Sequence, residues 1–189
     1  MTSASSNYNV SPEQIANEAD EIKRAQHNPA RFDVLYNRYY EPILKFIYKR
    51  VDTKDLAFDL TQQTFCKAMA NLHKYTPQGV PFSAWLYRIA MNELNLLFRS
   101  NKAQQALNVN VDEITNVLHE INTEGEEKYE PLLAALTALA PDDLLLIEMR
   151  FFEKRAFKEI GEILDITEIN AKTKTYRVIE KLKQLITKK

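Results

Sequence analysis

Phe157-Lys-Glu-Ile-Gly-Glu-Ile-Leu-Asp-Ile-Thr167 predicts a short helix followed by a tight corner in the C-terminal part of the chain. Thr167 is a suitable N-cap for a helix that follows it, and the preceding residues 165–166 leave room only for a tight corner. Gly161 lets two helices cross closely, and Asp165 tolerates a left-handed backbone better than most residues. Before this corner, apolar residues recur at helical spacing and predict a short amphipathic helix: Phe157, Ile160, Ile163 and Leu164.

The segment after Thr167 predicts a second helix with one apolar side and one polar, basic side. Its apolar stripe consists of Ala171, Thr175, Val178, Leu182 and Leu185. The opposite side carries Asn170, Thr173 and Arg177, flanked by Lys172, Lys174 and Lys181. Two helices joined by a short turn, the second basic on its free side, are typical of the helix-turn-helix that enters a DNA major groove. A helical hairpin with a solvated lysine face is the alternative.

Within this second helix we expect a division of labour. Asn170, Thr173 and Arg177 are best placed to meet base edges, whereas the flanking lysines are better placed to meet phosphates. Glu168 is a candidate acceptor for a cytosine amino group, although an acid in the first turn of a helix also favours the helix dipole.

Charge is distributed unevenly along the chain of 189 residues. The totals nearly cancel, with 25 Lys+Arg against 26 Asp+Glu. Residues 150–189 nevertheless contain eleven basic and six acidic residues, a net charge of +5, whereas residues 108–131 contain seven acids and one lysine, a net charge of −6. This separation predicts different partners for different segments.

Composition predicts a helical, cytoplasmic protein. The chain has only three glycines, and its single cysteine, Cys66, excludes an internal disulfide and suits a reducing compartment. The polar N-terminus does not resemble a secretion signal, and no apolar run is long enough for a membrane span, so we expect no membrane insertion.

Helix start and stop signals predict an all-α fold with two small domains. Residues 1–10 are expected to be disordered, residues 11–101 to form a helical bundle, residues 102–129 an acidic linker, and residues 130–189 the helix-turn-helix domain. In the first domain Ser11 is expected to cap a helix, Pro42 to kink or split the next one, and Ser83 to cap the last. In the second, Pro131 and Pro141 are expected to begin helices.

Two blocks of the first domain resemble a known family. Asp59-Leu-Thr-Gln-Gln-Thr-Phe65-Cys-Lys-Ala and Pro81-Phe-Ser-Ala-Trp-Leu-Tyr-Arg-Ile-Ala-Met-Asn92 are similar to conserved region 2 of bacterial sigma factors, with the extracytoplasmic-function (ECF) group of the sigma-70 family as the best match. The C-terminal stretch resembles region 4 of that family, and the blocks together cover about 130 residues in the family's order. Gln63 stands where the family usually has an acid, and Asp165 where it usually has glycine.

The resemblance implies an RNA polymerase sigma factor, which directs transcription initiation and carries no active site of its own. Core polymerase is the implied partner, through the clamp helices of its largest subunit and through its flap region for the C-terminal domain. The exposed side of one helix in the first domain is the implied docking site: Asp55, Asp59, Gln62, Gln63 and Lys67. Promoter DNA is the other partner, and an anti-sigma factor is a further candidate.

Promoter opening requires aromatic and hydrogen-bonding side chains that hold unstacked bases, together with cations for phosphates. Residues 74–99 interleave such groups, and we expect six of them at the −10 element: Lys74, Tyr75, Phe82, Arg88, Asn92 and Arg99. The −35 element is expected to meet the C-terminal domain through Thr167, Glu168, Asn170, Lys172, Thr173, Lys174, Arg177 and Lys181. For Trp85, Leu86 and Ile89 a place in the core is the stronger expectation.

No pattern in the chain favours catalysis. The three histidines, His27, His73 and His119, lie in separate segments, and no glycine-rich phosphate loop is present in the sequence. We therefore expect no metal, no cofactor and no small-molecule substrate. The main alternative is a helix-turn-helix transcriptional regulator whose N-terminal helical domain senses a ligand or partner, and a helical adaptor without a DNA role is the third class.

Overall fold

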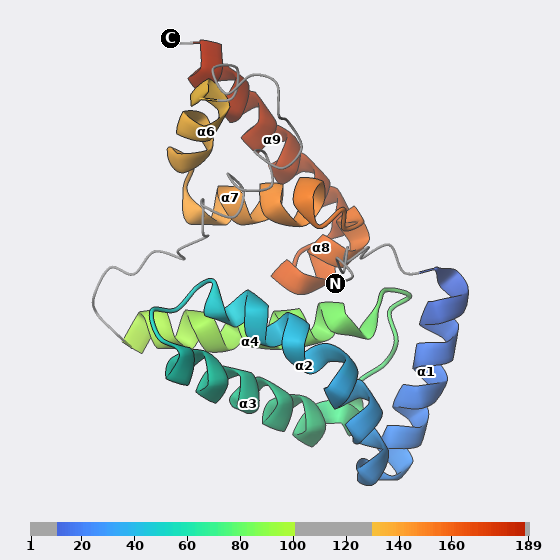
Figure 1. Ribbon diagram of the computed structural model, residues 1–189. Helices are drawn as coiled ribbons and strands as arrows, with labels where there is room; N and C mark the ends of the chain where they lie inside the picture. Colours follow the sequence, from blue (N-terminus) through green and yellow to red (C-terminus); the bar gives the residue numbers. More distant parts are fainter. Residues whose placement is uncertain (1–10, 101–129, 188–189) are drawn as a thin grey trace, which may run out of the picture.

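The computed structural model describes residues 11–100 and 130–187, and within these ranges every regular element is a helix (Figure 1). The predicted all-α fold is confirmed. The expected disordered residues 1–10 and the expected linker at residues 102–129 lie outside the described residues. The first helical unit contains α1 (Pro12–His27), α2 (Asp33–Tyr48), α3 (Lys54–Asn71) and α4 (Phe82–Ser100). The second contains α6 (Glu130–Thr137), α7 (Pro141–Ile147), α8 (Phe157–Leu164) and α9 (Glu168–Thr187).

The first helices begin where their capping residues predict. The Ser11 hydroxyl accepts the backbone N–H of Gln14 (3.2 Å), and the Gln14 side chain accepts the N–H of Ser11 (2.8 Å) in a reciprocal capping box. At α3 the Thr53 hydroxyl accepts the backbone N–H of Leu56 at 3.3 Å, as a single capping bond. Pro42 does not split α2, which continues through it because packing against α3 and α4 outweighs one missing backbone bond.

The start of α4 corrects one sequence-based expectation. Helix α4 begins at Phe82, so Ser83 lies inside it and is not its N-cap. The acceptor at this terminus is Glu18 of α1, whose carboxylate accepts the Phe82 backbone N–H at 2.7 Å and also the hydroxyl of Tyr39. A carboxylate at a helix N-terminus satisfies an otherwise unpaired donor and complements the helix dipole. Glu18 therefore joins α1, α2 and α4 at one point.

Apolar residues that recur at helical spacing form the core of the first unit, and Leu35, Ile43, Leu60 and Phe65 are buried in it. Helical spacing on α3 also predicts an inward position for Met69, and this prediction is wrong because Met69 is 51% exposed. The inward side of α3 is centred on Ala57, Leu60, Thr64 and Ala68, and Met69 lies one position beyond it.

In the second unit a turn of π-helix, η4 (Glu148–Phe152), follows α7 and leads to α8. Pro141 occupies the first turn of α7 and Pro131 that of α6, as predicted. Arg155 is fully buried and donates to the carboxylates of Glu153 and Glu159. These two ion pairs fix the segment between η4 and α8, and with it the position of the helix-turn-helix.

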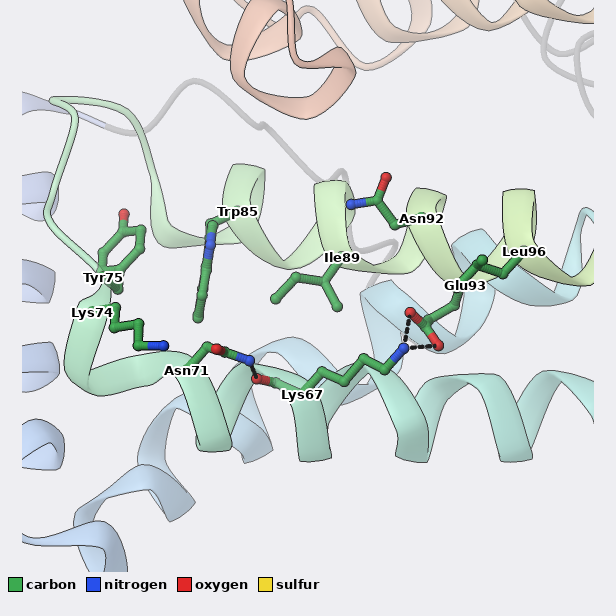
Figure 2. Close-up of a pocket in the computed structure, with 9 residues that line it drawn as sticks. All are labelled: Lys67, Asn71, Lys74, Tyr75, Trp85, Ile89, Asn92, Glu93 and Leu96. Carbon is green, nitrogen blue, oxygen red and sulfur yellow. Dashed lines mark hydrogen bonds and ion pairs between the residues drawn. The ribbon is translucent and has the colours of Figure 1, made fainter.

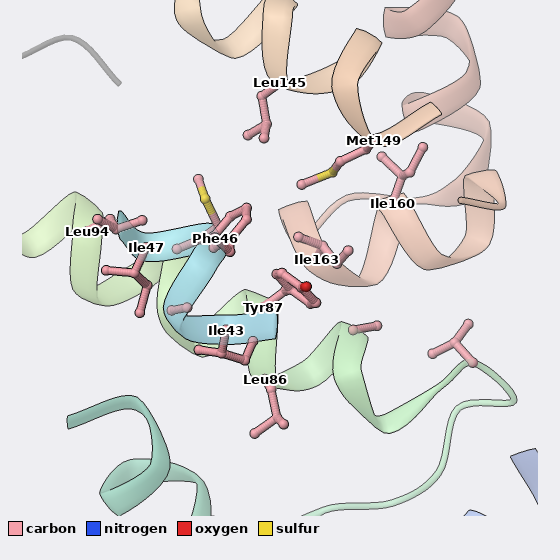
Figure 3. Close-up of a cluster of buried hydrophobic side chains, with 14 of the residues drawn as sticks. Ile43, Phe46, Ile47, Leu86, Tyr87, Leu94, Leu145, Met149, Ile160 and Ile163 are labelled. Carbon is pink, nitrogen blue, oxygen red and sulfur yellow. The ribbon is translucent and has the colours of Figure 1, made fainter. Parts of the chain in front are cut away.

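The two units share one buried apolar cluster (Figure 3). Phe46, Tyr87 and Leu86 of α2 and α4 lie on one side of it, and Leu145, Met149, Ile160 and Ile163 lie on the other. The Arg155 guanidinium stacks 4.3 Å from the centroid of the Tyr87 ring, and Arg50 Nη2 lies 2.6 Å from Glu148 Oε2. The sequence predicted two tethered domains; the structure adds a packed interface between them.

Candidate nucleic-acid interface

The corner between α8 and α9 has the geometry of a tight helix-turn-helix. Asp165 adopts a left-handed backbone (φ 56°, ψ 44°), as its type permits, and the Ile166 N–H donates to the Gly161 carbonyl at 2.9 Å. A Cβ on Gly161 would lie 2.7 Å from the Ile166 carbonyl oxygen. Glycine is therefore required at 161 by the backbone of the corner itself, and the expectation of a close approach at this residue is confirmed.

Helix α9 has the two-sided pattern that the sequence predicts. Ala171, Thr175, Val178 and Leu182 are buried against the rest of the second unit. Asn170, Thr173 and Arg177 are exposed on the other side. The Thr167 hydroxyl accepts the Asn170 N–H at 3.2 Å, so Thr167 is the predicted N-cap and places Glu168 in the first turn.

The three lysines of α9 differ in their surroundings. Lys172, Lys174 and Lys181 are all exposed. Lys181 Nζ, however, lies 2.8 Å from a carboxylate oxygen of Asp143 in α7. Lys181 is therefore paired inside the second unit, whereas no ion pair of Lys172 or Lys174 is found among the described residues. Ile169 and Tyr176 also stand exposed on this side, and the sequence analysis did not assign them a role.

The expected polymerase-docking residues share the outer side of α3. Asp55, Asp59, Gln62 and Gln63 are exposed, and they alternate with the buried Leu60 and Phe65 at helical spacing. Lys67 is different, because its ammonium contacts both carboxylate oxygens of Glu93 in α4 at 2.6 and 2.7 Å. Phe58, 41% exposed, adds an apolar group to the same surface that sequence reasoning missed.

An open pocket of about 480 Å³ lies between α3 and α4 (Figure 2). Three of the residues expected at the −10 element line it, namely Lys74, Tyr75 and Asn92. The Trp85 ring stands between Tyr75 and Ile89, with its centroid 4.8 Å from that of Tyr75. Lys67 and Glu93 lie at the other end. The pocket therefore combines a half-buried indole, an exposed amide and a cation, which are groups that hold an unstacked base.

The aromatic side chains around this pocket have structural as well as surface roles. Tyr75 packs edge-on against Phe82 at 5.2 Å, and burial raises the pKa of the Tyr75 hydroxyl, with Glu18 and Glu162 adding to the effect. Trp85 and Ile89 are half-buried, and Leu86 is fully buried. The expectation of a direct DNA contact is corrected for Phe82, which is fully buried: its ring supports Tyr75 and Trp85 from behind.

Besides Phe82, two of the expected −10 residues lie outside the pocket. Arg99 is exposed near the end of α4. Arg88 points to the second unit, where its guanidinium lies 3.2 Å from Glu162 and 2.5 Å from Asp165. Two carboxylates at the helix-turn-helix corner therefore pair with Arg88, a cation that we expected to contact DNA.

Among residues 11–100 and 130–187, no group of three His, Cys, Asp or Glu side chains is arranged to hold a metal ion. None of the helices in these ranges is long and apolar enough to cross a membrane.

Comparison with known proteins places the two candidate surfaces in two regions of one protein family. The model of sigma-70 region 2 matches residues 35–104, which include the α3 surface and the pocket, and the model of sigma-70 region 4 matches residues 135–184, which include the helix-turn-helix. The chain belongs to the sigma-70 family.

Curated ECF sigma factors align along most of this chain. The ECF RNA polymerase sigma factor BldN of Streptomyces coelicolor is 30% identical over 172 residues, which cover 87% of this chain and 64% of that protein. This chain therefore spans slightly less than two thirds of BldN. SigM of Bacillus subtilis is 24% identical and YlaC of the same organism 28% identical, and the alignments cover 93% and 91% of their lengths.

A solved structure has a similar fold. CnrH in complex with the cytosolic domain of CnrY gives a TM-score of 0.59 at 19% identity, over 89% of this chain and 96% of that chain. At this identity the likeness concerns the arrangement of the helices. It agrees with an all-α chain in which a region 2 unit precedes a region 4 unit.

Proposed function

We propose that this chain is a dissociable sigma subunit that binds core RNA polymerase in the cytoplasm and directs transcription initiation at specific promoters. The observation that carries the proposal is the presence, in one chain, of an open pocket in region 2, lined by an indole, an amide and a lysine, and a basic helix-turn-helix face in region 4. The match of residues 35–104 to sigma-70 region 2 favours a sigma subunit over a helix-turn-helix regulator with a ligand-sensing N-terminal domain.

The docking site for core polymerase is the outer side of α3, with Asp55, Asp59, Gln62 and Gln63 as its polar groups. These side chains are exposed and emerge from a helix whose inner side is locked by Leu60 and Phe65. Lys67 supports this surface indirectly, through its contact with Glu93. A rigid helix with an acidic and amide-rich outer side suits a partner that presents cations and amide groups.

The −10 element is captured by the pocket between α3 and α4. Asn92 offers donors and acceptors to a base edge, Trp85 a ring for stacking, and Lys74 a cation for the backbone. Arg88 joins this site only after the carboxylates of Glu162 and Asp165 release it, because phosphates and those carboxylates compete for one guanidinium. Capture of −10 DNA through Arg88 therefore requires the two units to separate there.

The −35 element is read by α9, with Asn170, Thr173 and Arg177 at the base edges and Lys172 and Lys174 at phosphates. Thr167 and Glu168 bring the helix N-terminus toward the DNA. The chain supplies recognition, and the polymerase supplies all of the chemistry. The sigma factor RpoE of Bartonella quintana, a solved structure of similar fold, is in complex with the anti-sigma factor NepR, and we propose that a protein of this class also binds the present chain.

Co-purification with core polymerase tests the docking proposal. We expect a stable complex with the wild-type chain and a strong loss of binding for Asp59→Lys. Asp20→Lys, an exposed acid on α1 away from the α3 surface, is the matched control and should bind normally. Normal binding by Asp59→Lys would exclude this surface, and no complex with any variant would favour a conventional regulator.

A further inference from the structure

The centre of the outward side of α9 is apolar, although the helix as a whole is basic. Ile169 is 79% exposed and Tyr176 is 53% exposed. At about 100° per residue, these two side chains lie within about 20° of each other around the helix, and Thr173 lies between them along its length. The buried stripe of Ala171 and Val178 is on the opposite side. Ile169, Thr173 and Tyr176 therefore form one outward strip, which we call the apolar strip.

This strip contributes little to the packing of the protein. The buried residues of α9 lie on the other side of the helix, and the strip adds one ring contact, that of Tyr176 with Phe157 of α8. Ile169 is the second residue of α9, and four-fifths of its side chain faces solvent. Single exposed apolar residues need no explanation, but here two large ones share the centre of the side that a helix-turn-helix presents to DNA.

Two contacts fix the chemistry of the strip. The Thr173 hydroxyl donates to the Ile169 carbonyl at 2.8 Å, so its proton is engaged within the helix and its methyl group remains. The Tyr176 ring lies 6.3 Å from the Phe157 ring of α8, and the Arg150 guanidinium lies 4.5 Å above that Phe157 ring. Tyr176 is thus supported by the Phe157 ring, which the Arg150 guanidinium itself contacts.

Cations border the strip and indicate what covers it. Helix α9 contains five basic residues and two acidic ones, a net charge of +3. Lys172 lies on one side of the strip, and Arg177 and Lys174 lie on the other. An apolar strip between cations fits a polyanion that displays apolar groups in a groove between two rows of phosphates. In the DNA major groove the apolar group of the base edges is the 5-methyl of thymine.

We infer that Ile169 is a specificity-determining residue that reads the 5-methyl group of a thymine in the −35 element, with Thr173 and Tyr176 extending the apolar contact along the groove. The inference rests on the proposed function, because it requires α9 to lie in the major groove. It changes the expected division of labour on α9: hydrogen bonds from Asn170 and Arg177 read bases at one side of the strip, and methyl contacts read thymine at its centre. Residues near the N-terminus of a recognition helix reach base edges first, which is the position of Ile169.

The test uses the full chain bound to core polymerase. A library randomised at the −35 element is first selected with this holoenzyme, and each selected thymine is then replaced by deoxyuridine, which removes only the 5-methyl group. We expect one position at which this replacement weakens wild-type binding about fourfold, equivalent to about 0.8 kcal/mol for one buried methyl group. With Ile169→Ala the same replacement should have no effect. Lys174→Ala is the control, and it should retain the full fourfold effect while binding all sequences less tightly.

The outcomes separate the inference from the function on which it rests. Failure to form a holoenzyme, or failure to enrich any −35 sequence, would reject the proposed function. Enrichment without a methyl effect at any thymine, or a methyl effect that persists in Ile169→Ala, overturns the inference alone. Ile169 is exposed and Ala is a better helix former, so the variant should fold normally. Its thermal unfolding should match that of the wild type.

Discussion

Arg50 and Glu148 form a buried ion pair although 98 positions separate them in the chain: Nη2 of Arg50 lies 2.6 Å from Oε2 of Glu148. The arginine side chain is fully buried, donates to the Phe46 carbonyl at 2.8 Å and stacks on the Phe46 ring at 3.8 Å. One partner follows α2 and the other follows α7. This pair therefore joins the region 2 and region 4 units inside their shared apolar cluster.

Removing one member of this pair should destabilise the packed arrangement. Arg50→Ala leaves the Glu148 carboxylate buried without its strongest partner, and we expect a loss of roughly 3–5 kcal/mol in urea unfolding. The double variant Arg50→Met/Glu148→Leu is the control, because two apolar side chains leave no unpaired charge, and it should lose much less. Equal losses of stability in the two variants would mean that Arg50 stabilises the protein through contacts other than its ion pair with Glu148.

The pH dependence of the free energy of unfolding should reveal the raised pKa of the Glu148 carboxyl. Burial raises the pKa of its carboxyl above the ordinary 4.5, although Arg50 acts in the opposite direction. A carboxyl with a raised folded pKa stabilises the folded state fully below 4.5, and this contribution is lost as the pH rises through the folded pKa. We therefore expect the free energy of unfolding of the wild type, relative to Glu148→Gln, to decrease as the pH is raised from 4.5 to 7. A difference that stays constant over this range would contradict the burial argument.

The helix-turn-helix corner should not tolerate a methyl group at position 161. In Gly161→Ala the added Cβ meets the Ile166 carbonyl oxygen at 2.7 Å, and backbone at a tight corner has little room to yield. We expect a loss of about 1–3 kcal/mol in urea unfolding. Gly79→Ala is the comparison. That glycine lies in a loop at φ 68°, where the Cβ would approach only the end of the flexible Lys158 side chain, so any cost there comes from the backbone conformation. Unchanged stability of Gly161→Ala would contradict the corner geometry.

Much of this architecture follows from local sequence signals. Ser11 and Thr167 cap helices as predicted, and Asp165 takes the left-handed conformation that its place at the corner requires. These features depend on residues within one turn of each other. The cap of α4 depends instead on Glu18, 64 positions from Phe82, and no local pattern identifies such an acceptor.

The residues of the candidate site divide in the same way, into those that the local sequence predicts and those whose position depends on contacts distant in the chain. The exposed side of α9 and the outer side of α3 follow from helical spacing, so their residues are where the sequence predicts them. Phe82 is buried because three aromatic rings from separate segments meet around it. Arg88 is paired with Asp165 because the two units pack together, and Lys181 is paired with Asp143 across two helices. The composition of the segments around Phe82, Arg88 and Lys181 does not predict these contacts.

The −10 pocket predicts a specific defect in promoter opening. Asn92 is exposed at the pocket, and Asn92→Ala should slow formation of the open complex on duplex promoters without reducing stability. The defect should shrink on templates already mismatched at −10, because unpairing has then been completed in advance. Asn95→Ala, an exposed asparagine on the same helix outside the pocket, is the matched control. Equal defects on both templates would indicate phosphate binding or misfolding.

Recognition of the −35 element should separate Arg177 from the lysines. Arg177→Ala should change discrimination among −35 sequences, with roughly 1–3 kcal/mol lost for each good base contact. Lys174→Ala should weaken all sequences alike and lower the salt slope by about one unit. Lys181→Ala should change that slope less, because this lysine already pairs with Asp143. Titrations of holoenzymes that contain each of the three variants against the randomised −35 library, at several salt concentrations, measure these effects. If Arg177→Ala weakened binding to all −35 sequences equally, Arg177 would not read bases.

Run-off transcription with purified core polymerase tests the central claim most directly. Core polymerase alone should give no specific transcript from genomic promoter fragments. Addition of the wild-type chain should produce discrete transcripts, which Asp59→Lys should abolish and Asn92→Ala should reduce. If the chain binds these fragments but core polymerase starts no specific transcript in its presence, the protein is not a sigma subunit.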